Sequence, residues 1–332
     1  MKKEILLIYT GGTIGMIKDP KKKSLVPFNF DKVLDALPEL KNSEIKLSNI
    51  SIKKPIDSSN MNIQVWIELA QIIKKNYKQY TGFVVLHGTD TMAFSASAMS
   101  FLLENLNKAV IFTGSQIPIG VTRTDAKENL ITSIEIAGSG KINEVGVFFE
   151  DQLYRGNRTV KVNTEHFEAF QSPNYPVLAQ AGVNIKYTSA IDKKTNEDLI
   201  VHTHLSNNVA ILKLFPAIKT EVIKAILNSA KGIVIESFGS GNAANNAELL
   251  KLLKEAIQKE KVLINITQCL HGRAVEEKYQ TSDVFVKSGV LCGKDLTTEA
   301  AITKLMFLLG QDISIKEIKK NMQKNLRGEI TI

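Results

Sequence analysis

The sequence has little cysteine and no long apolar run. Its 332 residues include two cysteines, Cys269 and Cys292, which are not spaced as a pair, so the sequence favours neither a disulfide framework nor a zinc site. No segment has the roughly 20 apolar residues of a transmembrane helix. The run Ile5–Ile8 after Met1-Lys2-Lys3 lacks the length and the cleavage site of a signal peptide. These features predict a globular protein of the reducing cytoplasm, with no membrane partner.

Arginine is also scarce, although the formal net charge is +8. Only five of the 42 basic residues are arginines, and the lysines are spread along the chain. Arginine is the residue that reads phosphates and bases through paired hydrogen bonds. The positive charge therefore gives little support to nucleic acid binding, and no nucleic acid partner is expected.

Short apolar segments that read as strands alternate with helical segments along most of the chain. This alternation predicts parallel sheets with right-handed crossovers. A polar, turn-rich stretch at about 191–209 predicts a linker between an N-terminal domain, 1–190, and a C-terminal domain, 210–332. We expect two α/β domains, a larger N-terminal one with a mostly parallel sheet flanked by helices and a smaller C-terminal one.

Two of the expected strands end in glycine and threonine. The first apolar run leads into Thr10-Gly11-Gly12-Thr13, and the strand Phe83–Leu86 leads into His87-Gly88-Thr89-Asp90. Ligands of open parallel sheets bind outside the carboxyl ends of the strands, and glycine lets the backbone approach them closely. A strand-to-helix turn would explain either motif alone, but their repetition favours a site.

A threonine hydroxyl acts as a nucleophile only beside a base or another activating group. Thr13, Thr89, Asp90 and Lys161 are all expected at the ends of neighbouring strands. Lys161 can accept a proton if its pKa is depressed, and Asp90 opposes that shift while it can also bind a substrate ammonium. Backbone N–H groups of the two glycine turns can form an oxyanion hole.

These motifs resemble the two signature motifs of the bacterial-type L-asparaginases. Further segments match in the same order: Asp57-Ser58-Ser59-Asn60-Met61, Thr113-Gly114-Ser115-Gln116, Arg155-Gly156-Asn157-Arg158 with Lys161, and Gly239-Ser240-Gly241-Asn242-Ala243. The resemblance covers nearly the whole chain. The motif Asp57-Ser58-Ser59 and the lack of a signal peptide pattern favour the cytoplasmic type I branch.

The resemblance implies hydrolysis of L-asparagine to L-aspartate and ammonia through an acyl-enzyme, with neither metal nor cofactor. Thr13 would be the nucleophile, and Thr89, Asp90 and Lys161 would form a second catalytic group. The substrate would contact a larger set: Gly12, Asp57, Ser58, Ser59, Gly88, Thr89, Asp90, Ser115 and Asn242. Asn242 would come from a neighbouring subunit, which implies a homodimer or a homotetramer.

Two departures from the family pattern matter. Many relatives carry a tyrosine in the loop after the first threonine, but residues 14–28 contain none and Leu25 is the nearest match. Tyr279, with Glu277 beside it, is a candidate to supply the missing hydroxyl, although a surface tyrosine is an equal interpretation. Glu236 stands where some type I enzymes use an arginine to bind asparagine as an activator. A glutamate loses that charge-assisted contact, so we expect weak or absent activation.

Two other functions compete with this interpretation. The amidase subunit of a tRNA-dependent amidotransferase shares the motifs, but such subunits carry extra N-terminal sequence, whereas here the first strand is expected from residue 4. A dinucleotide site could use Gly239-x-Gly241-x-x-Ala244, but such a pattern is weak alone. The next expected strand also ends in Thr267-Gln268, without the acidic residue that binds a ribose.

Overall fold

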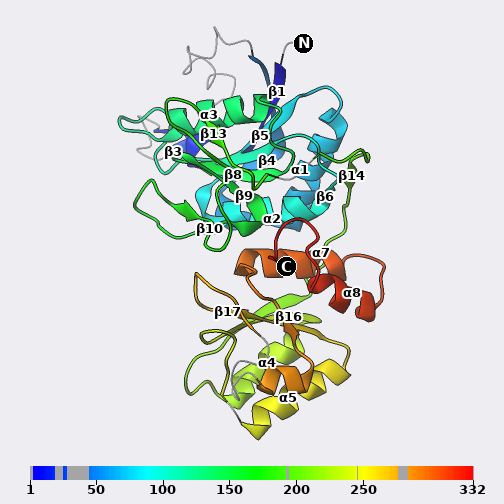
Figure 1. The fold of residues 1–332 in the computed structure, drawn as a ribbon. Coiled ribbons are helices and arrows are strands. Elements are labelled where there is room, and N and C mark those ends of the chain that lie inside the picture. The colour runs from blue at the N-terminus through cyan, green and yellow to red at the C-terminus, as the bar shows by residue number, and fades with distance from the viewer. Residues whose placement is uncertain are drawn as a thin grey trace. The chain divides into compact units, whose positions relative to one another are not determined.

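The chain divides into two compact units, Met1–Thr203 and His204–Ile332. The computed structural model describes residues 3–18, 25–27, 45–191, 194–244, 246–275 and 283–331. Each unit contains a sheet with helices on both of its faces (Figure 1). The expected fold class, two α/β domains with a larger N-terminal one, is confirmed.

The N-terminal sheet is mostly parallel. Within the described residues its strand order is β13-β12-β9-β8-β7-β5-β1-β4. The bounds are β1 Lys3–Gly11, β4 Ile45–Ile56, β5 Gly82–Leu86, β7 Val110–Thr113, β8 Val145–Phe149, β9 Gln152–Arg155, β12 Ala179–Gln180 and β13 Lys186–Tyr187. β4, β1, β5, β7 and β8 run parallel, and β9, β12 and β13 pair antiparallel with their neighbours. β1, β5 and β7 are nearly continuous apolar runs, as expected for strands buried on both faces.

Helices cover both faces of this sheet. α3 (Ala126–Gly138) lies on one face, and α1 (Ile63–Asn76) and α2 (Met92–Leu102) lie on the other (Figure 1). Leu130 and Ile134 of α3 share a core cluster with Ile5 and Leu7 of β1, because alternate residues of a strand face the same side. Of the helices described, none is long and apolar enough to cross a bilayer.

Among the described residues, three short strand pairs extend the N-terminal unit. They are β2 (Met16–Lys18) with β3 (Leu25–Pro27), β6 (Leu103–Glu104) with β14 (Ile200–Val201), and β10 (Val160–Lys161) with β11 (Phe170–Gln171). The β10–β11 hairpin matters for the site because it carries Lys161.

The C-terminal unit has a smaller parallel sheet in the order β15-β16-β17-β18. The bounds are β15 Val209–Lys213, β16 Gly232–Ser237, β17 Val262–Thr267, β18 Leu291–Cys292, α4 Thr220–Ser229, α5 Ala247–Gln258, α6 Asp283–Ser288, α7 Thr298–Leu309 and α8 Ile315–Met322. α4 and α5 pack on one face and α7 on the other (Figure 1). A Cβ on Gly232 of β16 would lie 2.7 Å from Leu305 of α7, so α7 lies very close to the strand.

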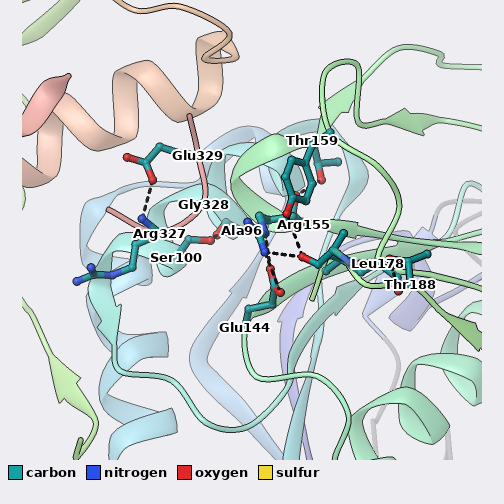
Figure 2. A network of polar contacts seen from close by, with 12 residues as sticks. Ala96, Ser100, Glu144, Arg155, Thr159, Leu178, Thr188, Arg327, Gly328 and Glu329 are labelled. Atoms are coloured by element: carbon teal, nitrogen blue, oxygen red, sulfur yellow. Dashed lines mark hydrogen bonds and ion pairs between the residues drawn. The ribbon is translucent and has the colours of Figure 1, made fainter. Parts of the chain in front are cut away.

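A fully buried ion pair fixes the end of the C-terminal unit. The ammonium of Lys304, on α7, lies 2.5 Å from a carboxylate oxygen of Glu329, and both side chains are inaccessible to solvent. Burial lowers the pKa of Lys304, and the charge of Glu329 opposes that shift. Lys304 also donates to the carbonyl of Met322. Glu329 accepts the backbone N–H of Arg327 (Figure 2). Both charges therefore have several partners in a site that excludes water.

Removing one charge from this pair leaves the other buried and uncompensated. We expect Lys304→Met to lower the free energy of unfolding by about 3–5 kcal/mol. Lys316→Met, on the exposed face of α8, is the matched control and should cost less than about 0.5 kcal/mol. Urea unfolding followed by circular dichroism measures both, and equal midpoints for the two variants would contradict the expectation.

Candidate active site

The turns that follow β1, β4 and β5 meet at glycines. Gly12 has a φ of +88°, and a Cβ there would lie 2.4 Å from the backbone N of Gly88. A Cβ on Gly88 would lie 2.5 Å from the hydroxyl of Ser58. Both distances are shorter than any real Cβ contact, so neither glycine can carry a side chain in this arrangement. The missing side chains bring the segments that carry Thr13, Ser58 and Thr89 into contact.

The position of Thr13 is fixed by its neighbours on both sides. Thr13 begins a short 3₁₀ turn, η1 (Thr13–Gly15), and is half-buried. Before it, the Thr10 hydroxyl donates to the carbonyl of Leu86 at 2.9 Å, which ties the end of β1 to β5. After it, the Tyr9 hydroxyl donates to the carbonyl of Gly15 at 3.3 Å. Burial raises the pKa of Tyr9, so the phenol keeps the proton that it donates.

Lys161 joins the side chains of Thr89 and Asp90. Its Nζ lies 2.7 Å from Thr89 Oγ1 and 2.7 Å from Asp90 Oδ1. The Lys161 side chain is 16% exposed, whereas that of Asp90 is 64% exposed. Because the ammonium has only donors, Thr89 Oγ1 accepts from it and its own proton points elsewhere. Gln116 Oε1, 3.5 Å away, is the acceptor found for that proton.

A buried arginine supports the segment that leads to Lys161. Arg155 Nε lies 2.6 Å from a carboxylate oxygen of Glu144, and its Nη2 reaches the other oxygen at 3.2 Å (Figure 2). Its carbonyl accepts the hydroxyl of Thr159 across the short turn η7 (Gly156–Arg158). This two-pronged pair is nearly inaccessible to solvent, and such pairs fix geometry well. The positive charge of Arg155 is therefore paired with Glu144, a residue that is distant from Lys161 in the sequence.

The turn after β7 packs against the end of β5. The carboxylate of Asp125 accepts the backbone N–H groups of Gln116 and Ile117, at 2.9 and 3.1 Å. Ser115 is buried, and its hydroxyl has no hydrogen-bond partner among the described residues. Sequence reasoning missed Asp125, because its carboxylate makes no capping bond to the helix that follows it and instead closes a turn eight and nine residues earlier in the chain.

Asp57 and Ser59 are joined by hydrogen bonds in this structure. One Asp57 oxygen accepts the backbone N–H of Ser59 at 2.8 Å and its hydroxyl at 2.6 Å, which caps the turn η5 (Ser58–Asn60). The bond from the Ser59 hydroxyl is the main cause that lowers the pKa of Asp57. Ser58 is buried, and its carbonyl accepts the hydroxyl of Thr91 at 2.7 Å. Of the three, Ser58 is the one held against the glycine turns.

The remaining predicted residues do not belong to the described part of the N-terminal unit. Asn242 belongs to the C-terminal unit, where it closes a tight turn by exchanging backbone hydrogen bonds with Phe238. Gly239 and Gly241, at φ of +47° and +107°, provide the left-handed backbone that the turn requires. Tyr279 and Glu277 fall outside the described residues.

The contact between the glycine turns predicts that alanine lowers stability more at Gly12 than at Gly140. Alanine at a positive φ costs about 1–2 kcal/mol, and we expect Gly140→Ala to cost no more, since its Cβ would meet nothing within 4 Å. Gly12→Ala adds a clash with the Gly88 backbone and should lower the free energy of unfolding by at least twice as much. Parallel urea titrations compare the two, and equal losses would show that the segments can separate freely.

Two family models match the chain. The model "Asparaginase, N-terminal" covers residues 4–193, and "Glutaminase/Asparaginase C-terminal domain" covers residues 208–322. L-asparaginase 1 of Escherichia coli K12 is 41% identical over 333 residues, which cover 99% of this chain and 98% of that protein. A glutamyl-tRNA(Gln) amidotransferase subunit from Pyrococcus abyssi is 32% identical, over 99% of this chain and 77% of that protein.

The fold agrees with the sequence matches. The crystal structure of L-asparaginase I from Vibrio cholerae superposes with a TM-score of 0.93 at 39% identity, over the full length of both chains. Similarity at this level extends through both units and is far too high for chance. The chain therefore belongs to the asparaginase family, as its motifs predict.

Proposed function

We propose that this protein hydrolyses L-asparagine to L-aspartate and ammonia. The observation that carries the proposal is the placement of Lys161 Nζ at 2.7 Å from both Thr89 Oγ1 and Asp90 Oδ1. That group lies next to the Gly12–Gly88 contact, which adjoins Thr13. Two threonine hydroxyls, an ammonium and a carboxylate at the carboxyl ends of neighbouring strands suit acyl transfer better than binding alone.

In the proposed reaction Thr13 is the nucleophile. Its Oγ1 bonds to the side-chain amide carbon of asparagine, the C–N bond breaks, and the nitrogen takes up the proton lost by Thr13 and leaves as ammonia. Water then attacks the ester, which releases aspartate and returns a proton to Thr13. We assign proton transfer to Thr89 and Lys161, with Asp90 holding the Lys161 ammonium. Backbone N–H groups of the glycine turns would stabilise the oxyanion.

The remaining residues suit recognition of an amino acid. The exposed carboxylate of Asp90 can accept the substrate α-ammonium, and Ser58 beside Gly12 and Gly88 can bind the α-carboxylate. The hydroxyl of Ser115, which has no partner among the described residues, offers a further polar contact. Asp57 and Ser59 keep the Ser58 turn in shape and line the same edge.

We further propose a homodimer or homotetramer in which Asn242 of a neighbouring subunit reaches the site, and in which Tyr279 supplies a hydroxyl near Thr13. No metal or cofactor takes part in this scheme. A cytoplasmic location remains a prediction from the sequence. The amidotransferase function is the weaker alternative, because that relative is less similar to this chain than L-asparaginase 1 of Escherichia coli is.

Removing either threonine hydroxyl tests the scheme. We expect Thr13→Ala to lower the rate of ammonia release from asparagine by about 10³-fold or more, as loss of a nucleophile does elsewhere, and Thr89→Val to lower kcat strongly as well. Thr220→Val, in the C-terminal unit, is the matched control. The protein is purified alone and assayed with asparagine and with glutamine. Near-normal activity of Thr13→Ala would refute the mechanism, and an inactive but folded wild type would favour the amidotransferase alternative.

The contacts of Glu236 lead to a further prediction, about the dependence of rate on substrate concentration. Its buried carboxylate accepts the hydroxyl of Thr298 at 2.6 Å and pairs with Lys213 Nζ at 3.3 Å. The position therefore holds an anion where an effector carboxylate would need a cation. We therefore expect a hyperbolic dependence of initial rate on asparagine concentration, with a Hill coefficient near 1. Rates are measured from far below to far above KM, and a sigmoidal curve would contradict the prediction.

A further inference from the structure

We propose that His87 is a positioning residue that orients the backbone N–H of Thr89 toward the reacting carbonyl oxygen. The proposal rests on the proposed amide hydrolysis. It assigns to His87 a part in placing the oxyanion donor, without any contact between the imidazole and the substrate.

His87 lies where the turns of the site press together. Its backbone N–H donates to the carbonyl of Thr113 at 2.9 Å, which continues the pairing of β5 with β7. Its carbonyl carbon lies 2.8 Å from the place of a Cβ on Gly12, and its carbonyl oxygen lies 2.4 Å from the place of a Cβ on Gly114. Two glycine turns thus pack directly on the His87 backbone.

The imidazole is fully buried and makes one hydrogen bond within the part of the chain that the structure describes. Its Nδ1 lies 2.7 Å from the carbonyl oxygen of Gly88. A carbonyl only accepts, so Nδ1 carries the proton. Burial lowers the pKa of His87 to about 4, so the ring is neutral near pH 7 and Nε2 has a free lone pair. Nε2 has no partner among the described residues.

An unpaired buried acceptor is unfavourable, and an apolar side chain of similar size would avoid it. The ring packs against Phe112, with centroids 5.8 Å apart, so an apolar residue would also suit the surroundings. What the histidine adds is the bond from Nδ1 to Gly88. Because burying Nε2 without a partner is unfavourable, the presence of a histidine here indicates that the bond from Nδ1 has a function.

The bond fixes the direction of one peptide group. No cis peptide bond occurs among the described residues, so the carbonyl of Gly88 and the N–H of Thr89 point in opposite directions across their shared plane. The imidazole holds the carbonyl toward the core. The Thr89 N–H consequently points away from the core, and it has no hydrogen-bond partner among the described residues. A donor held in this way suits a charge that develops during reaction.

His87→Leu and His87→Asn test the role of the bond. Leucine fills the site without a donor, and the asparagine amide can replace Nδ1 as the donor to Gly88. We expect His87→Leu to lower kcat about 10- to 100-fold, less than the about 10²–10³-fold caused by deleting an oxyanion donor. KM should stay within about threefold, because the contact strengthens only in the transition state. His87→Asn should recover kcat to within about fivefold of the wild type.

Three controls separate positioning from other roles. Phe112→Leu disturbs the same packing but keeps the donor, so its kcat should stay within about threefold, and a loss equal to that of His87→Leu would overturn the proposal. His87→Asn should leave the pH profile of kcat unchanged, and an inflection that disappears in this variant would make His87 a titrating catalytic group instead. If His87→Leu keeps full kcat, or if His87→Asn folds normally but is as slow as His87→Leu, the proposal is wrong. Wild-type ammonia release is measured alongside, so that failure of the proposed function is recognised separately.

Discussion

The site depends on the contact between the backbones of Gly12 and Gly88. These residues follow β1 and β5, which are neighbours in the parallel sheet, and no Cβ can stand between them. The sheet brings the two strand ends to one edge, and the absence of side chains lets the turns touch. Four polar residues of the candidate site lie on the turns that meet here: Thr13 on one turn, Thr89 and Asp90 on the other, and Ser58 against Gly88.

The polar groups around that contact are held by bonds to the backbone. Asp57 caps the turn of Ser58, and Asp125 holds the turn of Gln116. In both cases a carboxylate accepts N–H groups that a tight turn leaves unpaired. Lys161 is held differently, on a two-residue strand of a hairpin, with the Glu144–Arg155 pair anchoring the chain before it. Loops at this sheet edge therefore carry the candidate catalytic residues, and buried charges and caps limit their movement.

Much of this arrangement is predictable from sequence because it follows from strong local patterns. Uninterrupted apolar runs such as Ile5–Ile8 and Phe83–Leu86 predict buried parallel strands, and Gly-Thr after each run predicts where polar groups gather. The family motifs add the prediction that Asp90 and Lys161 are neighbours. Asp125 and Gln116 are harder to place, because their roles depend on how a turn closes. The Lys304–Glu329 pair joins residues 25 positions apart, and nothing local in the sequence marks either charge as buried. The orphaned nitrogen of His87 likewise becomes visible only when burial is known.

The hard contact between the two turns also limits how the sequence can change. A side chain at Gly12 would need Gly88 to move, and a side chain at Gly88 would need Ser58 to move. The three positions therefore form one mutational unit, although 76 residues separate the first from the last. A side chain at Gly12 or Gly88 is tolerated only together with a shift of these neighbouring segments. The spacing of the two turns that carry the threonines is thus limited at Gly12 by contact with the Gly88 backbone, which no change of rotamer can relax.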